Sequence, residues 1–285
     1  MQKAFLDHIA SVLNETIINY SSVSGGDISE AFKIETSNNS YFLKVNTLEA
    51  KGIFEVEKHG LETIKHSNTI ATPKVIYVGN FEENAYLILE FIETKQPNDT
   101  DFNRLGEQLA KLHSTTANTF GLETNNFIGS LPQQNHFHDN WTDFYINERL
   151  LPQLHMAKAQ GLLQAYEIPS TNVFETVLTP WFENIKPALL HGDLWSGNFL
   201  ISKDGTPFLI DPAVYYGHNE VDIALSKLFG GFNTTFYSAY QKHLPFDAFT
   251  NARIEIYQLY YLLVHLNLFG RSYYTSVKHI LTKYF

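Results

Sequence analysis

The segment of residues 190–200, LHGDLWSGNFL, constrains this chain most, because it carries closely spaced polar side chains between two apolar runs. Asp193 and Asn198 lie five positions apart, and the later run FLID ends in Asp211. A carboxylate can orient a hydroxyl group and accept its proton, whereas an amide oxygen and a second carboxylate are ligands that Mg²⁺ prefers. The pattern therefore predicts Asp193 as a catalytic base, with Asn198 and Asp211 as magnesium ligands.

Such a loop, followed by a strand hairpin, is typical of protein-kinase-like phosphotransferases, which pass the terminal phosphoryl group of ATP to an acceptor. A structural alternative stays open, in which Asp193 caps a turn, Asn198 is a turn residue and His191 is a core histidine. The combination of HGDLWSGN with a later hydrophobic-Asp pair favours the catalytic interpretation.

The chain before residue 93 fits the nucleotide-binding part of such a fold. Residues 21–46 read as strand, turn, strand, turn and strand. Gly25 and Gly26 in the first turn would let backbone amides approach a phosphate, although an ordinary hairpin turn explains them equally well. Lys44 in the third strand is predicted to contact the phosphates of the nucleotide. The alternative is a lysine that faces solvent.

The next helix, expected over residues 52–67, offers a partner for that lysine. Glu57 lies four residues before Leu61 and seven before Ile64, so it shares their inward face and is preferred over Glu55. Both glutamates could instead be surface charges.

The strand that follows, AYLILEFIE, would run into the hinge of a kinase-like fold. There the backbone groups of Glu90, Phe91 and Ile92 would bind the adenine edge. The prediction rests on their position in the chain order.

The remainder predicts a larger, mainly helical part. Asp99 or Asp101 would cap a helix over 101–114, in which His113 is structural, and residues 119–140 read as a long irregular loop. Helices are also expected over 141–160, interrupted at a proline, and over 172–185. Asp222 should begin a further helix and anchor the catalytic loop through buried hydrogen bonds.

We therefore expect an α+β, bilobal, protein-kinase-like fold. Residues 1–93 would form a small N-lobe of antiparallel sheet plus helix, and residues 94–285 a C-lobe with the catalytic loop and the substrate pocket. His136 and His138 suggest a metal site, but no third ligand has supporting spacing.

Composition excludes several classes of function. The 285 residues contain no cysteine, so disulfides and thiolate sites are ruled out. A net charge of −10 argues against a nucleic-acid partner. No apolar run is long enough for a membrane span, and the N-terminus alternates like an amphipathic helix and not like a signal peptide. We expect a cytoplasmic protein, monomeric or weakly dimeric, with no membrane partner.

Several longer motifs resemble the fructosamine kinase (ketosamine 3-kinase) family, a branch of the aminoglycoside-phosphotransferase group. They are HGDLWSGN, DPAVYYGHNEVDIAL, LFGGF and YQLYYLLVHLNLFG, together with GGDISEAFKI and YFLKVN near the N-terminus. The resemblance spans essentially the whole chain. It implies ATP- and Mg²⁺-dependent phosphorylation of the 3-hydroxyl of a ketoamine, either a small molecule or a glycated protein lysine. The product is unstable and sheds the sugar, so the activity would be deglycating, as in protein repair.

The resemblance assigns the same base, the same metal ligands, the Lys44–Glu57 pair and the hinge residues. It adds Trp195, whose ring could wall the sugar pocket and make a cation–π contact to a protonated ketoamine nitrogen. A plain core tryptophan is the alternative. His218, His265 and Asn267 are weaker substrate-pocket candidates. Some relatives carry a redox-linked cysteine in the glycine-rich turn; this chain has none, so no thiol switch is expected.

Two rival functions remain. One is a kinase for another small hydroxylated amine, such as an aminoglycoside or choline. The other is a nucleotide-binding pseudokinase that regulates a partner. The presence of Lys44, Asp193, Asn198 and Asp211 together argues against the second.

Overall fold

The computed structural model describes residues 2–23 and 29–285 and divides into two compact units. Unit 1 comprises Met1–Pro97 and Phe199–Asp211, and unit 2 comprises Asn98–Asn198 and Pro212–Phe285. The first unit therefore extends four residues beyond the expected boundary and takes in a hairpin that we had placed in the second.

The inserted hairpin consists of β9 (Phe199–Ile201) and β10 (Pro207–Leu209). It belongs to unit 1 because single β-bridges join Ser202 to Thr94 and Phe208 to Ala71. Its turn has Gly205 at φ 85°, the left-handed region that glycine enters without steric cost, as the Asp-Gly pair predicts.

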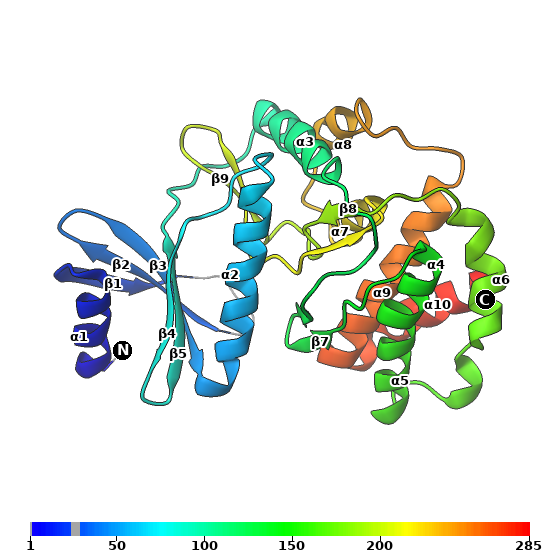
Figure 1. Ribbon diagram of the computed structural model, residues 1–285, viewed down its shortest axis with the longest axis horizontal. Coiled ribbons are helices and arrows are strands. Elements are labelled where there is room, and N and C mark those ends of the chain that lie inside the picture. Colours follow the sequence, from blue (N-terminus) through cyan, green and yellow to red (C-terminus); the bar gives the residue numbers. More distant parts are fainter. Residues whose placement is uncertain (1, 24–28) are drawn as a thin grey trace. The chain divides into compact units, whose positions relative to one another are not determined.

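Unit 1 is built on a five-stranded antiparallel sheet in the order β1-β2-β3-β5-β4 (Figure 1). The predicted alternation of turns and strands is confirmed for the described residues. Gly25 and Gly26 lie outside them. The strands are β1 (Ile17–Ser22), β2 (Glu30–Thr36), β3 (Ser40–Thr47), β4 (Val75–Phe81) and β5 (Asn84–Glu90).

Two helices cover opposite faces of this sheet: α1 (Lys3–Leu13), and α2 (Lys51–His66), which follows the short turn Leu48–Ala50. Alternation along β5 separates the two cores, because successive side chains of a strand point to opposite faces. Tyr86 and Ile88 pack with α1, whereas Leu87 and Leu89 pack with α2. The middle strands are thus buried on both sides.

Unit 2 is mainly helical, and α9 (Thr250–Phe269) forms its centre, contacting α5, α7 and α10. This helix is buried almost all round, which confirms that the apolar segment is core. No helix in the described ranges is long and apolar enough to cross a membrane. The other helices are α3 (Asp99–His113), α4 (Trp141–Phe144), α5 (Leu151–Ala159), α6 (Thr171–Leu178), α7 (Glu220–Leu228), α8 (Thr234–Gln241) and α10 (Tyr274–Tyr284), with 3₁₀ turns at Ala165–Glu167, Thr179–Trp181 and Arg271–Tyr273.

Short strands support the catalytic loop. β8 (Ala188–Leu190) pairs with β11 (Tyr215–Gly217), so Leu190 lies opposite Tyr215. A second hairpin, β6 (Asn126–Ile128) with β7 (Leu131–Gln133), occurs where we expected irregular loop. That expectation was wrong because the polar residues are buried and bonded: Gln133 donates to the Asn126 side chain at 2.8 Å.

Two helix predictions also need correction. The helix from residue 141 does not break at Pro152 but widens into a π-helical segment, Tyr145–Leu150, just before it. Proline has no amide hydrogen to donate, and the wider turn accommodates that loss. The helix expected over 172–185 ends at Leu178, because Pro180 follows at once.

The cap of α3 is Asn98, not Asp99 or Asp101. The Asn98 side chain accepts from the Asp101 amide at 3.1 Å, and the Asp101 carboxylate accepts from the Asn98 amide at 2.9 Å. Asp101 is thus the reciprocal partner in a capping box, which fixes where α3 begins.

We predict that Asn98→Ala lowers the free energy of unfolding by about 1 kcal/mol, the usual cost of removing such a cap. Urea titration followed by circular dichroism measures it. Asn172→Ala, at an exposed position early in α6, is the matched control and should change the midpoint little. Equal effects of the two substitutions would contradict the assigned cap.

Candidate active-site residues

Lys44 lies in the middle of β3 and is buried, with only 7% of its surface exposed. Its neighbours Leu43 and Val45 pack in the α1 core, so strand alternation directs Lys44 to the α2 face. There its Nζ donates to Glu57 Oε1 at 2.8 Å and also to Asp211 Oδ1. One buried cation therefore joins β3, α2 and the end of the inserted hairpin.

The choice between the two glutamates of α2 follows the predicted helical geometry. Glu57 faces the sheet together with Phe54 and Leu61, whereas Glu55 is exposed. Asp211, which contacts Lys44, has φ 54°, a backbone conformation that non-glycine residues rarely adopt. The hairpin thus ends in a backbone kink at the residue that carries the carboxylate.

These three side chains hold more negative than positive charge. Burial lowers the pKa of Lys44, but the charges of Asp211 and Glu57 outweigh it and raise that pKa above its ordinary value. Burial raises the pKa of Glu57 to about 8; the Lys44 charge opposes this shift and the Asp211 charge adds to it. The raised pKa of Glu57 means that Lys44 does not balance both carboxylates when both are ionised, and a further cation beside them would favour the ionised form of Glu57.

We predict that Glu57 makes the protein less stable as pH rises. Its proton is held more tightly in the folded chain than at its ordinary pKa of 4.5, so this stabilisation is present below pH 4.5 and is lost as pH approaches 8. The free energy of unfolding should fall by up to about 1.4 kcal/mol per pH unit from this one proton.

Urea unfolding between pH 5 and pH 8.5 checks this effect. Glu57→Gln should flatten the pH dependence, while Glu55→Gln on the same helix should leave it as in the unmodified protein. A Glu57→Gln profile parallel to that of the unmodified protein would show that this carboxyl does not titrate in the window.

The catalytic loop, residues 191–198 of unit 2, is closed by a side-chain contact between the predicted base and one predicted metal ligand. Asn198 Nδ2 donates to the backbone oxygen of Asp193 at 2.8 Å and to its carboxylate Oδ2 at 2.9 Å. Because an amide nitrogen only donates, Oδ1 is the atom of Asn198 that can act as a ligand. The spacing of five residues thus orients both functional groups.

The start of this loop is fixed by Asp222, which is fully buried. Its carboxylate accepts from the backbone amides of His191 at 2.8 Å and Gly192 at 2.9 Å, and from His113 Nε2 at 3.0 Å. Burial raises the pKa of Asp222, but the bond and charge of His113 outweigh it and hold that pKa below its usual range. The predicted anchoring role of Asp222 and the structural role of His113 are confirmed.

Two supporting residues escaped the sequence analysis. Gly192 has φ 83°, and a Cβ at this position would lie 2.1 Å from the Ala213 oxygen, so only glycine fits. Tyr261 donates its hydroxyl proton to the Gly192 oxygen at 2.8 Å. The HGD motif could have indicated the glycine. No local signal marks Tyr261, which arrives from a helix 69 residues further along.

Trp195 is half-buried and lies on the catalytic loop itself. Its ring covers Gly197, where an added Cβ would come within 2.3 Å of the indole. Since Gly197 is exposed, the indole is a surface feature of the loop. This placement disfavours the plain core alternative.

The three weaker substrate candidates lie in different places within unit 2. His265 accompanies Tyr261 on α9 and packs against Phe229 with ring centroids 4.6 Å apart. Asn267 is buried and donates to the Gln153 side chain at 2.7 Å. His218 follows Gly217, which pairs with Ala188 at the end of β8 farther from the catalytic loop. The His218 ring lies against the Tyr257 hydroxyl, with Nδ1 at 2.8 Å.

The histidines that suggested a metal site share one acidic partner. His136 and His138 both contact Glu148, at 3.2 Å and 3.0 Å. Across residues 2–23 and 29–285, no group of three or more histidine or acidic side chains could hold a metal ion.

The predicted hinge segment borders a pocket of about 320 Å³ in unit 1. The amide of Glu90 donates to the Lys74 oxygen at 2.9 Å, and that of Phe91 donates to the Ser40 oxygen at 3.4 Å. Within the described residues, Ile92 is thus the one of these three hinge residues whose amide donates to no backbone oxygen. The pocket is lined by Glu90, Phe91, Ile92, Glu93, Ser202, Lys203, Asp204, Thr206 and Phe208.

Comparisons with known proteins agree with this geometry. The family model for fructosamine kinase matches residues 1–285. A probable ketoamine kinase of Enterococcus faecium is 40% identical over 264 residues, covering 92% of this chain and 94% of its own length. A crystal structure from Haemophilus somnus, solved as a candidate fructosamine-3-kinase, has a TM-score of 0.87 at 27% identity and covers 98% of this chain and 96% of its own.

A more distant match shows the fold alone. An aminoglycoside phosphotransferase bound to a non-hydrolysable ATP analogue and hygromycin B has a TM-score of 0.66 at 17% identity, covering 99% of this chain and 98% of its own. The predicted α+β, protein-kinase-like fold class is therefore confirmed.

The protein-kinase-like fold and the family match define a phosphotransferase of that class. Within that class, the chain belongs to the fructosamine kinase family, and the predicted resemblance is confirmed over its full length.

Proposed function

We propose that this protein is an ATP- and Mg²⁺-dependent kinase that phosphorylates the 3-hydroxyl of a ketoamine and so promotes its deglycation. The family match over residues 1–285 carries the proposal. The side chains that such a reaction needs are also present: a lysine–glutamate pair and a carboxylate in unit 1, and a base with an adjacent amide in unit 2.

In unit 1, Lys44 supplies positive charge for the nucleotide phosphates and Glu57 holds it in place. Asp211 in unit 1 and Asn198 Oδ1 in unit 2 are the residues that we propose for Mg²⁺, because each offers an oxygen of the kind this ion prefers. The donor set fits, because both protein ligands are oxygens and Lys44 alone does not balance Glu57 and Asp211 when both are ionised. When bound, the ion offsets phosphate charge.

In unit 2, Asp193 orients the sugar hydroxyl and accepts its proton, and the Asn198 amide fixes the carboxylate for that task. Trp195 offers its ring to the sugar and to a protonated ketoamine nitrogen, and His265 is the second substrate candidate. Positioning and electrostatics supply most of the rate, as expected for phosphoryl transfer.

In the hinge, the adenine edge would bind to the amide of Ile92, because the amides of Glu90 and Phe91 already have backbone acceptors. The pocket beside it is lined by unit 1 alone. This proposal depends on backbone groups and is insensitive to the side chain at residue 92.

The acceptor is a small ketoamine or a glycated lysine of a protein, in the cytoplasm, and we propose a monomer or weak homodimer. The rival within enzymes is a kinase for an aminoglycoside- or choline-like amine, since an aminoglycoside kinase shares the fold. The family match favours the ketoamine.

We predict that Asp193→Asn cuts turnover by about 10²–10⁴-fold, the usual contribution of general base catalysis, while the fold and nucleotide binding remain. ATP consumption with Mg²⁺ is the measurement, and Asp139→Asn, an exposed carboxylate of the same unit, is the control. Near-normal turnover in Asp193→Asn would remove this residue from the role of base.

The same assay identifies the acceptor when ribulose-lysine, fructose-lysine and an aminoglycoside are compared. Turnover on a ketoamine that disappears in Asp193→Asn is the expected outcome. Activity on the aminoglycoside alone would move the chain to the antibiotic-kinase branch. Silence on all three with nucleotide still bound would favour a regulatory role.

We predict that Asp211→Ala abolishes the strengthening of nucleotide binding by Mg²⁺. Without Mg²⁺ the variant should bind ATP at least as well as the unmodified protein, because Lys44 has lost a competing carboxylate. Titration calorimetry with and without Mg²⁺ measures both, with Asp7→Ala on the exposed side of α1 as the control. An unchanged Mg²⁺ effect would exclude Asp211 as a ligand.

A further inference from the structure

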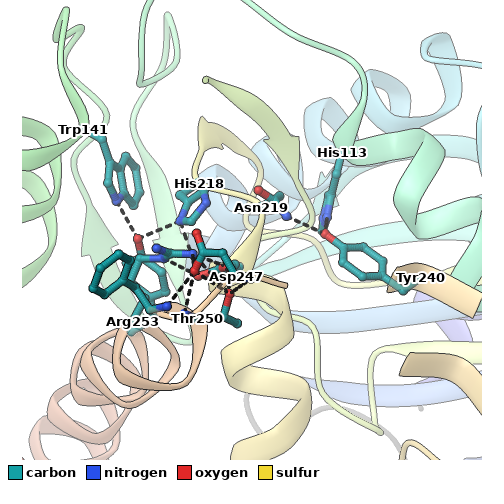
Figure 2. A network of polar contacts seen from close by, with 11 residues as sticks. His113, Trp141, His218, Asn219, Tyr240, Asp247, Thr250 and Arg253 are labelled. Atoms are coloured by element: carbon teal, nitrogen blue, oxygen red, sulfur yellow. Dashed lines mark hydrogen bonds and ion pairs between the residues drawn. The ribbon is translucent and has the colours of Figure 1, made fainter. Parts of the chain in front are cut away.

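Unit 2 contains a second cavity, of about 470 Å³, away from the catalytic loop. Ala188 lines it, at the end of β8 opposite to the end that leads into the loop. Its floor is formed by buried residues, His113, His218 and Arg253, and its mouth by the exposed segment 183–186. Figure 2 shows the polar network around this floor.

One wall of the cavity is a chain of hydrogen bonds that ends on a protein carboxylate. Asn219 Nδ2 donates to the Tyr240 hydroxyl at 2.7 Å, and that hydroxyl lies 2.8 Å from His113 Nδ1. His113 Nε2 then donates to Asp222 at 3.0 Å (Figure 2 shows the first part). The Nε2 proton of His113 is thus donated to Asp222, the residue that anchors the catalytic loop.

A second series of hydrogen bonds has the same order of donor, tyrosine and histidine, but no carboxylate accepts from its histidine. Trp141 Nε1 donates to the Tyr257 hydroxyl at 2.9 Å, and Tyr257 lies 2.8 Å from His218 Nδ1 (Figure 2). An indole can only donate, so the phenol proton is directed to Nδ1. Burial lowers the pKa of His218 to about 4, so the neutral ring carries its proton on Nε2. Within the described residues, Nε2 has no hydrogen-bond acceptor.

Arg253 adds a second donor of this kind. Its Nε and Nη2 are committed to Glu220, each at 2.7 Å, and Nη2 also contacts Asp247 at 2.9 Å. In the part of the chain that the structure describes, Nη1 has no acceptor, although Arg253 is only 6% exposed. Neither nitrogen is fully enclosed, so solvent in the cavity can reach both. A cavity lined by two donors that have no protein acceptor suits a ligand that brings acceptor oxygens.

We propose that this cavity binds a small zwitterion of the amino-acid type. Its carboxylate would accept from His218 Nε2 and Arg253 Nη1, with Lys186 at the mouth adding positive charge. Its ammonium group would face Glu183 and Asp247, which also line the cavity. A simple anion fits less well, because the carboxylates of Glu183 and Asp247 in the same lining would repel it.

The site is suited to regulation, because the same cavity is lined by His113, which holds Asp222 and through it the amides of the catalytic loop. The binding proposal goes beyond the proposed kinase activity and does not depend on it. L-lysine, the amine that deglycation of fructose-lysine releases, belongs to the proposed ligand class and is a natural probe.

Calorimetric titration of the full chain with L-lysine and with L-lysine amide tests the proposal, without nucleotide or ketoamine. We expect saturable binding of L-lysine and about tenfold weaker binding of the amide, which lacks the carboxylate. Lys186→Ala should weaken L-lysine binding about tenfold, whereas Lys158→Ala, an exposed lysine of α5 outside the cavity, should not.

Nitrogen-15 NMR of the histidine rings gives an independent readout. The His218 signals should show Nε2 protonated in the free protein and should shift when L-lysine binds. No saturable binding of L-lysine would overturn the proposal, as would equal affinity for its amide or unchanged affinity in Lys186→Ala. The binding titration contains no ATP and no ketoamine, whereas the kinase assay requires both. Failure of the binding proposal can therefore be distinguished from failure of the proposed kinase activity.

Discussion

Asp222 is the buried carboxylate on which the catalytic loop depends. It accepts from the amides of His191 and Gly192 and from His113, so removing it would leave three donors without an acceptor in the core of unit 2. A buried carboxylate is tolerated only when hydrogen-bond donors surround it, and two of the donors to Asp222 are backbone amides of the catalytic loop. The position of Asp193 follows from that constraint.

Unit 1 depends on a buried cluster of one lysine and two carboxylates. Lys44 is buried between Glu57 and Asp211, so a single cation serves two carboxylates. The protein maintains this arrangement with a two-sided sheet, a helix and a kinked hairpin end. When both carboxylates are ionised the cluster carries a net negative charge, and this property supports the magnesium role that we propose for Asp211.

The site residues that the sequence predicts share one property: each prediction rests on local spacing. Glu57 was separated from Glu55 by its distance from Leu61 and Ile64, and the HGDLWSGN motif placed Asp193 and Asn198. The failures involve partners from far along the chain. The β6–β7 hairpin looked like loop because its polar residues are buried against residues some 80 positions away, which composition cannot reveal.

The sequence by itself determined the fold class and the family, and it supplied the residues that we propose for catalysis, because these depend on periodicity and motif spacing. Only the tertiary structure decided that the hairpin ending in Asp211 belongs with the sheet, that Tyr261 supports Gly192, and that His218 lines a separate cavity. These features depend on contacts between segments that are distant in the sequence. Packing and the hydrogen bonding of buried polar groups select one partner for each segment, and local sequence patterns do not distinguish among the possible partners.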